Sequence, residues 1–238
     1  MGKNLIIQKR GRGTSTYRAP SFRYKGKSEH RKYDNETVSG IVSNIIHCPG
    51  HSAPLIEIKY ENGETCLMVA PEGIKIGDEV CSGSQAKLNN GNSLALENIP
   101  EGTLIYNIES VPGDGGCFVR SSGTFAKIIS KSQGKVTVLL PSRKIRVFDS
   151  RCRATIGVVA ASGRTEKPFV KAGKKYHYMR ARNKLYPRVC GVSMNAVDHP
   201  FGGSSSHHKG RPTIAPRFAP PGRNVGKIRP SRTGRRKR

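Results

Sequence analysis

The sequence lacks several features on which common classes of protein depend. It has no tryptophan, no run of about 18 apolar residues, and no charged-then-apolar signal segment at its start. Its six cysteines include no Cys-x-x-Cys pair, which a zinc ribbon needs to close a tetrahedral site. We therefore expect a soluble, intracellular protein with no membrane partner.

The best local set of metal ligands stands alone in the sequence. It is His47-Cys48-Pro49-Gly50-His51, and no second cluster of ligands follows it. A Pro-Gly turn between strands, with free thiols, explains this segment better than a metal site does. The sequence thus predicts no resident metal and no cofactor, with magnesium entering only through a bound nucleic acid.

Acidic residues are scarce outside one part of the chain. Residues 1–32 carry ten Lys or Arg and one acid, residues 33–118 carry three and twelve, and residues 119–238 carry 29 and three. The net charge of +26 is therefore carried by the parts that flank an acidic segment, and no acid follows Asp198. With 35% apolar residues overall, we expect the chain ends to be disordered alone and ordered by a large anion such as nucleic acid.

The acidic segment has the pattern of a small β-barrel. Residues 55–60 alternate with period two, which places Ile56, Ile58 and Tyr60 on one face, and Asn62-Gly63 predicts a hairpin turn after them. Turn signals recur about every 8–12 residues, as in a five-stranded OB-type barrel. The strands predicted here are residues 38–47, 55–60, 65–70 and 74–80.

A second series of short strands follows Asn89-Asn90-Gly91 and predicts an SH3-like barrel. Its turns hold cations, so one rim should be electropositive. Only residues 174–186 have a helical pattern, which Pro187 ends. The strands predicted here are residues 103–108, 124–130, 136–140, 145–148 and 154–159, and the cations are Lys131, Lys135, Arg143, Lys144, Arg151 and Arg153.

The fold class predicted from these patterns is all-β, an OB-fold-like barrel followed by an SH3-like barrel, with long basic N- and C-terminal extensions of little regular structure. We expect a basic N-terminal arm at residues 1–36 and an OB-fold-like RNA-binding barrel at residues 37–85. An SH3-like barrel should occupy residues 86–162, and a basic C-terminal extension that penetrates RNA should occupy residues 163–238.

The N-terminal arm interleaves aromatic and basic side chains between Tyr17 and Lys27. Unpaired RNA bases stack on aromatic rings and guanidinium planes while basic groups bind phosphates, so this pattern favours single-stranded RNA. The alternative is that Phe22 and Tyr24 only pin the arm to the first barrel. In the tail, arginine and glycine together suit phosphate binding by guanidinium and backbone N–H groups.

Three other uses of the basic charge fit less well. A membrane-surface segment would need an amphipathic period, which the tail does not have. A DNA-compacting tail has a similar composition, and electrostatics alone does not separate DNA from RNA. Sequence-specific DNA binding favours a helix in the major groove, which this sequence hardly offers. We therefore expect folded RNA.

One segment, residues 191–203, could carry chemistry. Asp198 beside His199 resembles an acid and a base, but neighbours in an extended chain point to opposite sides, and no nucleophile has a spacing that commits it to the pair. In a field of phosphates the pKa of His199 should rise, which suits a cationic contact better than a general base. His199 is thus a disfavoured catalytic candidate, and we predict no catalytic residue and no metal ligand.

The predicted RNA contacts share a basic, aromatic or loop character. They are Arg10, Arg12, Tyr17, Arg18, Phe22, Arg23, Tyr24, Lys25, Lys27, Arg31, Lys32, Arg143, Lys144, Arg151, Arg153, Lys171, Lys174, Lys175, Arg180, Arg182, Arg188, Asn195, Asp198, His199, Gly202, Gly203, His207, His208, Lys209, Arg211, Arg217, Arg223, Lys227, Arg235 and Arg236.

The motif Asn195-Ala196-Val197-Asp198-His199-Pro200-Phe201-Gly202-Gly203 makes the sequence recognisable. The chain resembles the universal large-subunit ribosomal protein two family, the L-two family, nearly end to end. Ala196 and Phe201 depart from the bacterial pattern, and Phe201 resembles the archaeal and eukaryotic branch. The small size and simple tails favour the archaeal side of that branch. The other matching segments are residues 39–42, 47–54, 70–74, 91–92, 100–103, 112–116, 171–173, 187–189 and 221–226.

The resemblance implies a role in the cytoplasmic ribosome. Members of the family bind large-subunit rRNA as primary binders, lie beside other ribosomal proteins, and contact small-subunit rRNA through an intersubunit bridge. They are also linked to tRNA binding and to support of the peptidyl transferase region. The motif histidine, here His199, was once proposed as a catalyst of peptidyl transfer, so two readings follow: a structural RNA-binding protein, or a catalytic participant in that reaction.

Overall fold

The computed structural model describes residues 2–32 and 36–227, which form two compact units. The β unit runs from Ser21 to Phe169. The extension unit contains the described residues up to Pro20 together with those from Val170 onward. The predicted arm at 1–36 is therefore divided between the two units at residue 20. Within the described residues, no helix is both long and apolar enough to cross a membrane.

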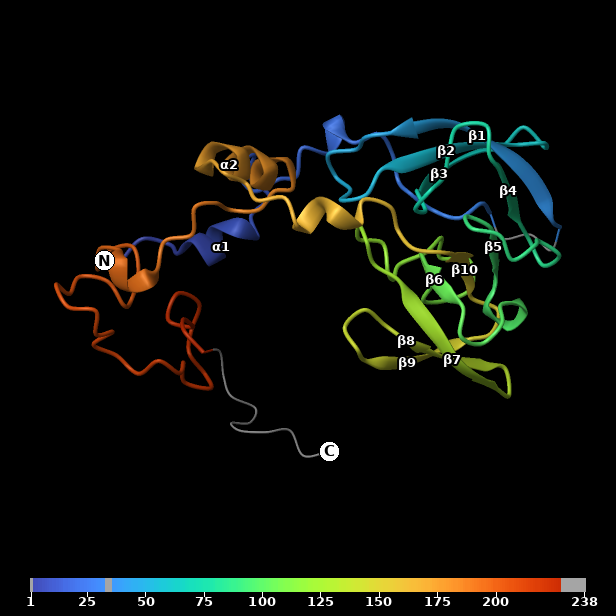
Figure 1. Cartoon of the computed structure of the whole chain (residues 1–238). Coiled ribbons are helices and arrows are strands. Elements are labelled where there is room, and N and C mark those ends of the chain that lie inside the picture. The colour runs from blue at the N-terminus through green and yellow to red at the C-terminus, as the bar shows by residue number, and fades with distance from the viewer. Residues whose placement is uncertain (1, 33–35, 228–238) are drawn as a thin grey trace. The chain divides into compact units, whose positions relative to one another are not determined.

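The β unit is built on one ten-stranded sheet in the order β3-β2-β1-β4-β5-β10-β6-β7-β8-β9. Figure 1 shows β1 to β4 at one end of the unit and β6 to β9 at the other. The strands are β1 (Val38–Ile46), β2 (Leu55–Tyr60), β3 (Thr65–Val69), β4 (Glu79–Ser82), β5 (Ser93–Ala95), β6 (Leu104–Tyr106), β7 (Ala126–Ser132), β8 (Lys135–Leu139), β9 (Ile145–Asp149) and β10 (Arg153–Ile156). Short 3-10 helices lie at Ser21–Arg23, Leu96–Asn98 and Ser162–Thr165.

The all-β fold class is confirmed, and the sheet is consistent with an OB-fold-like barrel followed by an SH3-like barrel. β1 pairs antiparallel with both β2 and β4, and β3 pairs with β2. A single parallel bridge between Ser82 of β4 and Ser93 of β5 carries the sheet from the first set of strands into the second. The period-two pattern of β2 is also confirmed, because Ile56, Ile58 and Tyr60 are all buried.

One strand prediction in this region is wrong, and one strand was not predicted. The strand expected at residues 74–80 begins only at Glu79, because the preceding residues form a turn in which Asp78 accepts a hydrogen bond from the Lys75 backbone N–H (2.7 Å). Gly77 in that turn has φ +93°, which a strand does not allow. β5 was not predicted, since three residues are too few to show an alternation.

A shared core fixes the two barrels to each other. Leu55 and Val69 of the first barrel are fully buried against Tyr106 and Val159 of the second. The Tyr106 hydroxyl donates a 3.0 Å hydrogen bond to the Val69 carbonyl oxygen, which satisfies the one polar atom of that ring in the core. The β unit therefore behaves as one rigid scaffold.

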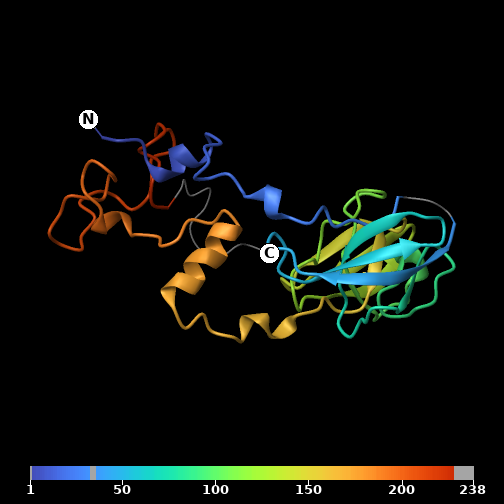
Figure 2. The same ribbon diagram turned by 90° about the horizontal axis from the view of Figure 1, so that it is seen from above.

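The extension unit has little regular structure and a core of three residues. Its helices are α1 (Ile6–Arg10), α2 (Ala172–Ala181) and a 3-10 turn at Gly191–Ser193. The core brings together Leu5, Phe201 and Val225 from distant parts of the chain. In Figure 2 the orange helix α2 is followed by chain that is almost wholly irregular. The helix predicted at 174–186 thus begins two residues earlier and ends at Ala181, because Asn183 adopts φ +51°.

Candidate nucleic-acid interface

Most of the predicted RNA contacts lie on the surface of their unit. Helix α2 has no buried residue, so none of its side chains is packed in a core of its own unit. Tyr17, Tyr24, Lys175, Arg182, His199 and Gly202 are half-buried. The exposed contacts are Arg10, Arg12, Arg18, Phe22, Arg23, Lys25, Lys27, Lys32, Arg143, Lys144, Arg151, Lys171, Lys174, Arg180, Arg188, Asn195, Asp198, Gly203, His207, His208, Lys209, Arg211, Arg217, Arg223 and Lys227; Arg235 and Arg236 lie outside the described residues.

The two aromatic residues at the start of the β unit differ in what they contact. Tyr24 packs against the shared core and covers Gly50, where a Cβ would come within 2.9 Å of the ring. Phe22 is 82% exposed, and the Arg23 guanidinium lies 5.4 Å from its ring centroid. Tyr24 therefore pins the chain to the barrel, while Phe22 has a ring face available for a nucleobase.

The prediction that Arg31 and Arg153 contact RNA is wrong, because the structure buries both side chains. Arg153, which lies on β10 and not in a turn, is 6% exposed and forms a 2.8 Å ion pair with the fully buried Glu109. Arg31 is 5% exposed, and its Nε donates to Glu64 at 2.7 Å. Buried charges require such partners, so both arginines stabilise the fold.

The Glu109 carboxylate is the centre of this buried network. It accepts hydrogen bonds from the Arg153 side chain and from the backbone N–H groups of Gly113, Gly115 and Arg153. Burial alone would raise the pKa of Glu109, but the hydrogen bonds from Arg153 outweigh it and keep the pKa below the ordinary value. The pair is therefore charged in the folded protein.

The sequence assigned residues 28–32 to the flexible arm. In the structure, hydrogen bonds hold these residues against both barrels. The Arg153 Nη1 donates to the Arg31 carbonyl oxygen (2.7 Å), and Arg120 donates to that of Ser28 (2.6 Å). The backbone N–H of Glu29 donates to Leu67 of the first barrel, and that of His30 to Gly115 of the second. We name residues 28–32 the strap. Within the strap the side chains of Ser28, His30 and Arg31 are buried, and Lys32 is the predicted RNA contact that stays exposed.

His30 is the buried titratable group of the strap. Its Nε2 lies 2.6 Å from the Asn107 carbonyl oxygen, to which it donates. Burial lowers the pKa of His30 to about 4, and the neighbouring positive charge of Arg153 adds to the effect. The imidazole is therefore neutral at physiological pH, and the strap carries no charge at this point.

The predicted electropositive rim of the second barrel is made by fewer residues than expected. Arg143 and Lys144 are exposed in the turn between β8 and β9. Arg151 is exposed but forms a 3.1 Å ion pair with Asp149. Lys131 donates through Nζ to the Glu97 carbonyl oxygen. Lys135 is exposed at the start of β8. The charge of the rim is therefore carried by Arg143 and Lys144 in the β8–β9 turn and by Lys131 and Lys135 beside the β7–β8 turn.

The loop around His199 is a turn and not the extended chain that the sequence predicts. The backbone N–H groups of Asp198 and His199 both donate to the Asn195 carbonyl oxygen, at 3.0 and 3.1 Å. The Asp198 carboxylate lies 3.7 Å from Lys3 Nζ, and the His199 Nδ1 accepts from the Phe201 backbone N–H at 3.0 Å. The acid and the imidazole therefore have different partners, and they do not form a catalytic pair.

Glycines allow the tight packing of this loop. A Cβ on Gly191 would overlap the His199 imidazole, and one on Gly202 would overlap the carbonyl groups of Met194 and Asn195. Burial lowers the pKa of His199. The ring is thus a packed, neutral side chain of the free protein that closes the turn around Phe201.

The segment His47–His51, the best local set of metal ligands in the sequence, does not form a cluster of ligands. Cys48 is fully buried in the shared core, and no group of three or more His, Cys, Asp or Glu side chains within residues 2–32 and 36–227 could hold a metal ion.

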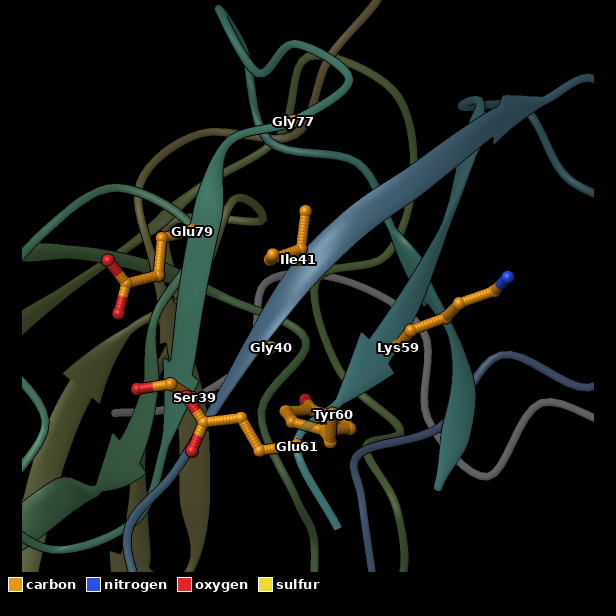
Figure 3. Close-up of a pocket in the computed structure, with 8 residues that line it drawn as sticks. All are labelled: Ser39, Gly40, Ile41, Lys59, Tyr60, Glu61, Gly77 and Glu79. Carbon is orange, nitrogen blue, oxygen red and sulfur yellow. The ribbon is translucent and has the colours of Figure 1, made fainter. Parts of the chain in front are cut away.

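The outer face of the first barrel is acidic. Figure 3 shows an open groove there, in which Ile41 of β1 stands beside Glu79 of β4, while Glu61 lies past the end of β2. Its volume is about 610 Å³, and Lys59 is the basic residue among those that line it. Two carboxylates against one ammonium give the lining a small net negative charge, which suits a phosphate backbone less well than the basic extensions do.

These features define a class of protein. Two joined β-barrels form a rigid scaffold with one acidic face, and basic, largely irregular extensions expose arginine–aromatic pairs, as expected of a protein that binds a large folded RNA.

Comparison with known proteins agrees with this class and identifies the family. Residues 3–82 match the model "Ribosomal Proteins L2, RNA binding N-terminal domain", and residues 89–218 match "Ribosomal Proteins L2, C-terminal domain". "Large ribosomal subunit protein uL2" of Methanothermobacter thermautotrophicus is 54% identical, with all of both chains covered. That of Haloarcula marismortui is 52% identical, covering 99% of this chain and 98% of its own. The chain belongs to the ribosomal protein L2 (uL2) family, and the relatives named here are archaeal.

Among the exposed aromatic residues that sequence reasoning missed, Phe218 has the largest exposed fraction. Phe218 is 87% exposed, with the Arg217 guanidinium 5.4 Å from its ring centroid, in the same arrangement as Phe22 and Arg23. The adjacent arginine and the flanking prolines 216 and 220 were the available signal, since together they predict a turn that exposes its central residues.

Proposed function

We propose that this protein is a structural constituent of the large ribosomal subunit, in the cytoplasm, where it binds large-subunit rRNA beside other ribosomal proteins. The observation that carries the proposal is the surface of the extension unit, where basic side chains are exposed and where no acid follows Asp198. The one acid in its motif loop, Asp198, is itself paired with Lys3. A surface of this kind gains affinity from every phosphate that it neutralises.

The division of charge within the β unit supports an orientation in the subunit. The acidic groove around Ile41, Glu61 and Glu79 faces away from rRNA, while the extensions enter it. The exposed β8–β9 turn with Arg143 and Lys144 is the part of the second barrel best suited to an intersubunit bridge with small-subunit rRNA. The protein supports subunit association and tRNA binding by holding rRNA in place, and not through a binding pocket of its own.

The same geometry argues against the catalytic alternative. His199 accepts a hydrogen bond from its own loop, and Asp198 is committed to Lys3. The motif loop therefore supports the peptidyl transferase region by holding RNA, and the protein is not an enzyme. It requires no cofactor, and magnesium takes part only as an ion bound to rRNA.

A salt titration with matched charge variants tests the proposal. We expect the affinity of the full chain for deproteinised large-subunit rRNA to fall steeply as salt rises. Replacing Arg211, Arg217 and Arg223 together by alanine should flatten the slope of log K against log salt by about 2, at roughly 0.7–0.9 per lost phosphate contact. Replacing the three exposed lysines of the acidic segment, Lys59, Lys75 and Lys87, removes the same charge and should leave the slope unchanged. Equal effects of the two triple variants would contradict the proposal.

A further inference from the structure

Phe218 lies at the tip of a loop whose two ends are held together. The Ala215 N–H donates to the Lys227 carbonyl oxygen (3.1 Å), and the Lys227 N–H donates to that of Thr213 (2.9 Å). Ala215 and Val225, at the two ends of the loop, are both buried. The loop is therefore anchored at its base by backbone hydrogen bonds and by the small core of the extension unit.

The tip of this loop is shaped by a tight turn. The Ala219 N–H donates to the Pro216 carbonyl oxygen (3.2 Å), so Arg217 and Phe218 are the central residues of the turn. Central residues of such a turn point outward, which explains why the Phe218 ring is 87% exposed. The Arg217 guanidinium lies 5.4 Å from the ring centroid. The structure thus presents a large apolar ring on a fixed loop, with a cation beside it.

The surroundings of Phe218 indicate which ligand suits it. No acidic residue occurs after Asp198, so the loop has no group to pair with a basic protein partner. A lipid surface would need several apolar residues on one face, whereas Phe218 is accompanied by arginines, prolines and glycine. An unpaired nucleotide offers a base with a π-face for the ring and a phosphate for the guanidinium, and it matches both features.

We propose that Phe218 and Arg217 form a binding site for one unpaired nucleobase of large-subunit rRNA, with the base stacked on the Phe218 ring and its phosphate near Arg217. The site rests on the proposed function, since it needs rRNA to be the partner of the extension unit. Phe22 and Arg23 repeat the pair at the start of the β unit, which makes stacking by an arginine–phenylalanine pair a recurrent device in this chain.

The absence of tryptophan provides a direct test. Phe218→Trp introduces the only indole of the chain, and stacking on a base quenches indole fluorescence and shields it from acrylamide. We expect saturating deproteinised large-subunit rRNA to reduce the emission at least twofold and to lower the acrylamide quenching constant by a similar factor. The control is Ile76→Trp, at an exposed position of the acidic segment, whose emission and quenching should stay unchanged.

Affinity measurements complete the test. Phe218→Ala should weaken rRNA binding about tenfold, whereas Phe218→Tyr, which keeps the ring, should bind like the original chain. Val189→Ala, at another exposed apolar position of the extension unit, should have less than a twofold effect. Because Phe218 is exposed, all of these variants should unfold at the same temperature as the original protein.

The outcomes separate the site from the proposed function. If the unsubstituted chain does not bind rRNA, the proposed function fails and the site fails with it. If the chain binds but the indole at position 218 keeps its emission and its acrylamide access, only the nucleobase site is overturned. Shielding that appears only when other ribosomal proteins are added would identify a protein pocket and would also overturn it.

Discussion

Replacing Arg153 by alanine tests the correction that this arginine belongs to the fold and not to the RNA interface. Arg151, two residues earlier, provides a matched control, since it is also paired with a carboxylate. The two pairs differ in burial: the side chains of Arg151 and Asp149 are 67% and 40% exposed, and those of Arg153 and Glu109 are 8% and 0% exposed. The same deletion is thus made in two environments.

The expected loss in the free energy of unfolding depends on the groups that each deletion leaves without a partner. Without Arg153, the Glu109 carboxylate keeps three backbone donors but loses two side-chain hydrogen bonds and its countercharge. The strap also loses the donor to the Arg31 carbonyl oxygen. Removing one partner of a buried pair costs roughly 3–5 kcal/mol, and the remaining donors put this case near 3 kcal/mol. Deleting Arg151 should cost much less, because solvent screens its exposed pair with Asp149.

Urea unfolding of the RNA-free protein at neutral pH measures both values. We expect the midpoint for Arg153→Ala to fall well below that for Arg151→Ala, with an unchanged m-value. The intrinsic affinity for rRNA should be similar for the folded forms of both variants. If Arg153→Ala were as stable as Arg151→Ala but bound rRNA more weakly, the burial of Arg153 would be refuted, and the original prediction of an RNA contact would be restored.

Two further predictions concern histidines. Lowering the pH from about 7.5 to 5 should reduce the free energy of unfolding by about 2 kcal/mol through His30, since its folded pKa is about 4 and the unfolded chain, at about 6.5, takes up the proton first. His30→Gln should remove this part of the pH dependence when the free energy of unfolding is measured by urea titration at each pH. If the free energy of unfolding of His30→Gln fell with pH as steeply as that of the original protein, the burial of His30 would be contradicted. Large subunits reconstituted with His199→Ala should transfer peptide at near-normal rates, and loss of transfer in normally assembled subunits would favour the catalytic alternative.

The fold was predictable where it depends on local pattern. The alternation in residues 55–60 and the Asn62-Gly63 turn define β2 and its hairpin, because side chains of a half-buried strand alternate between core and solvent. β5 was not predictable, since its three residues are held by a parallel bridge to Ser82 and by β10, both distant in the sequence. The missed turn at Gly77 has a local part, the Lys75–Asp78 hydrogen bond, and a distant part, a hydrogen bond from the Gly77 N–H to Val42 on another strand.

Composition was enough to predict that the protein has a nucleic-acid interface. It was not enough to predict which basic residues belong to that interface. A run without acids indicates an anionic partner, yet it does not tell a phosphate contact from a buried ion pair. Arg31 and Arg153 resemble their exposed neighbours in sequence, and only Glu64 and Glu109, brought near by the fold, make them internal. Phe218 was missed for the opposite reason, because an isolated phenylalanine in a tail has no periodic pattern.

The most direct test of the account is a map of the positions at which ultraviolet light crosslinks this chain to rRNA in assembled large subunits. We expect crosslinked peptides from the N-terminal segment up to Lys27 and from the extension unit, including the loop around Phe218. We expect none from the acidic groove at Ile41, Glu61 and Glu79. Crosslinks concentrated on that groove, with none in the extension unit, would contradict the central claim that the basic extensions hold the RNA.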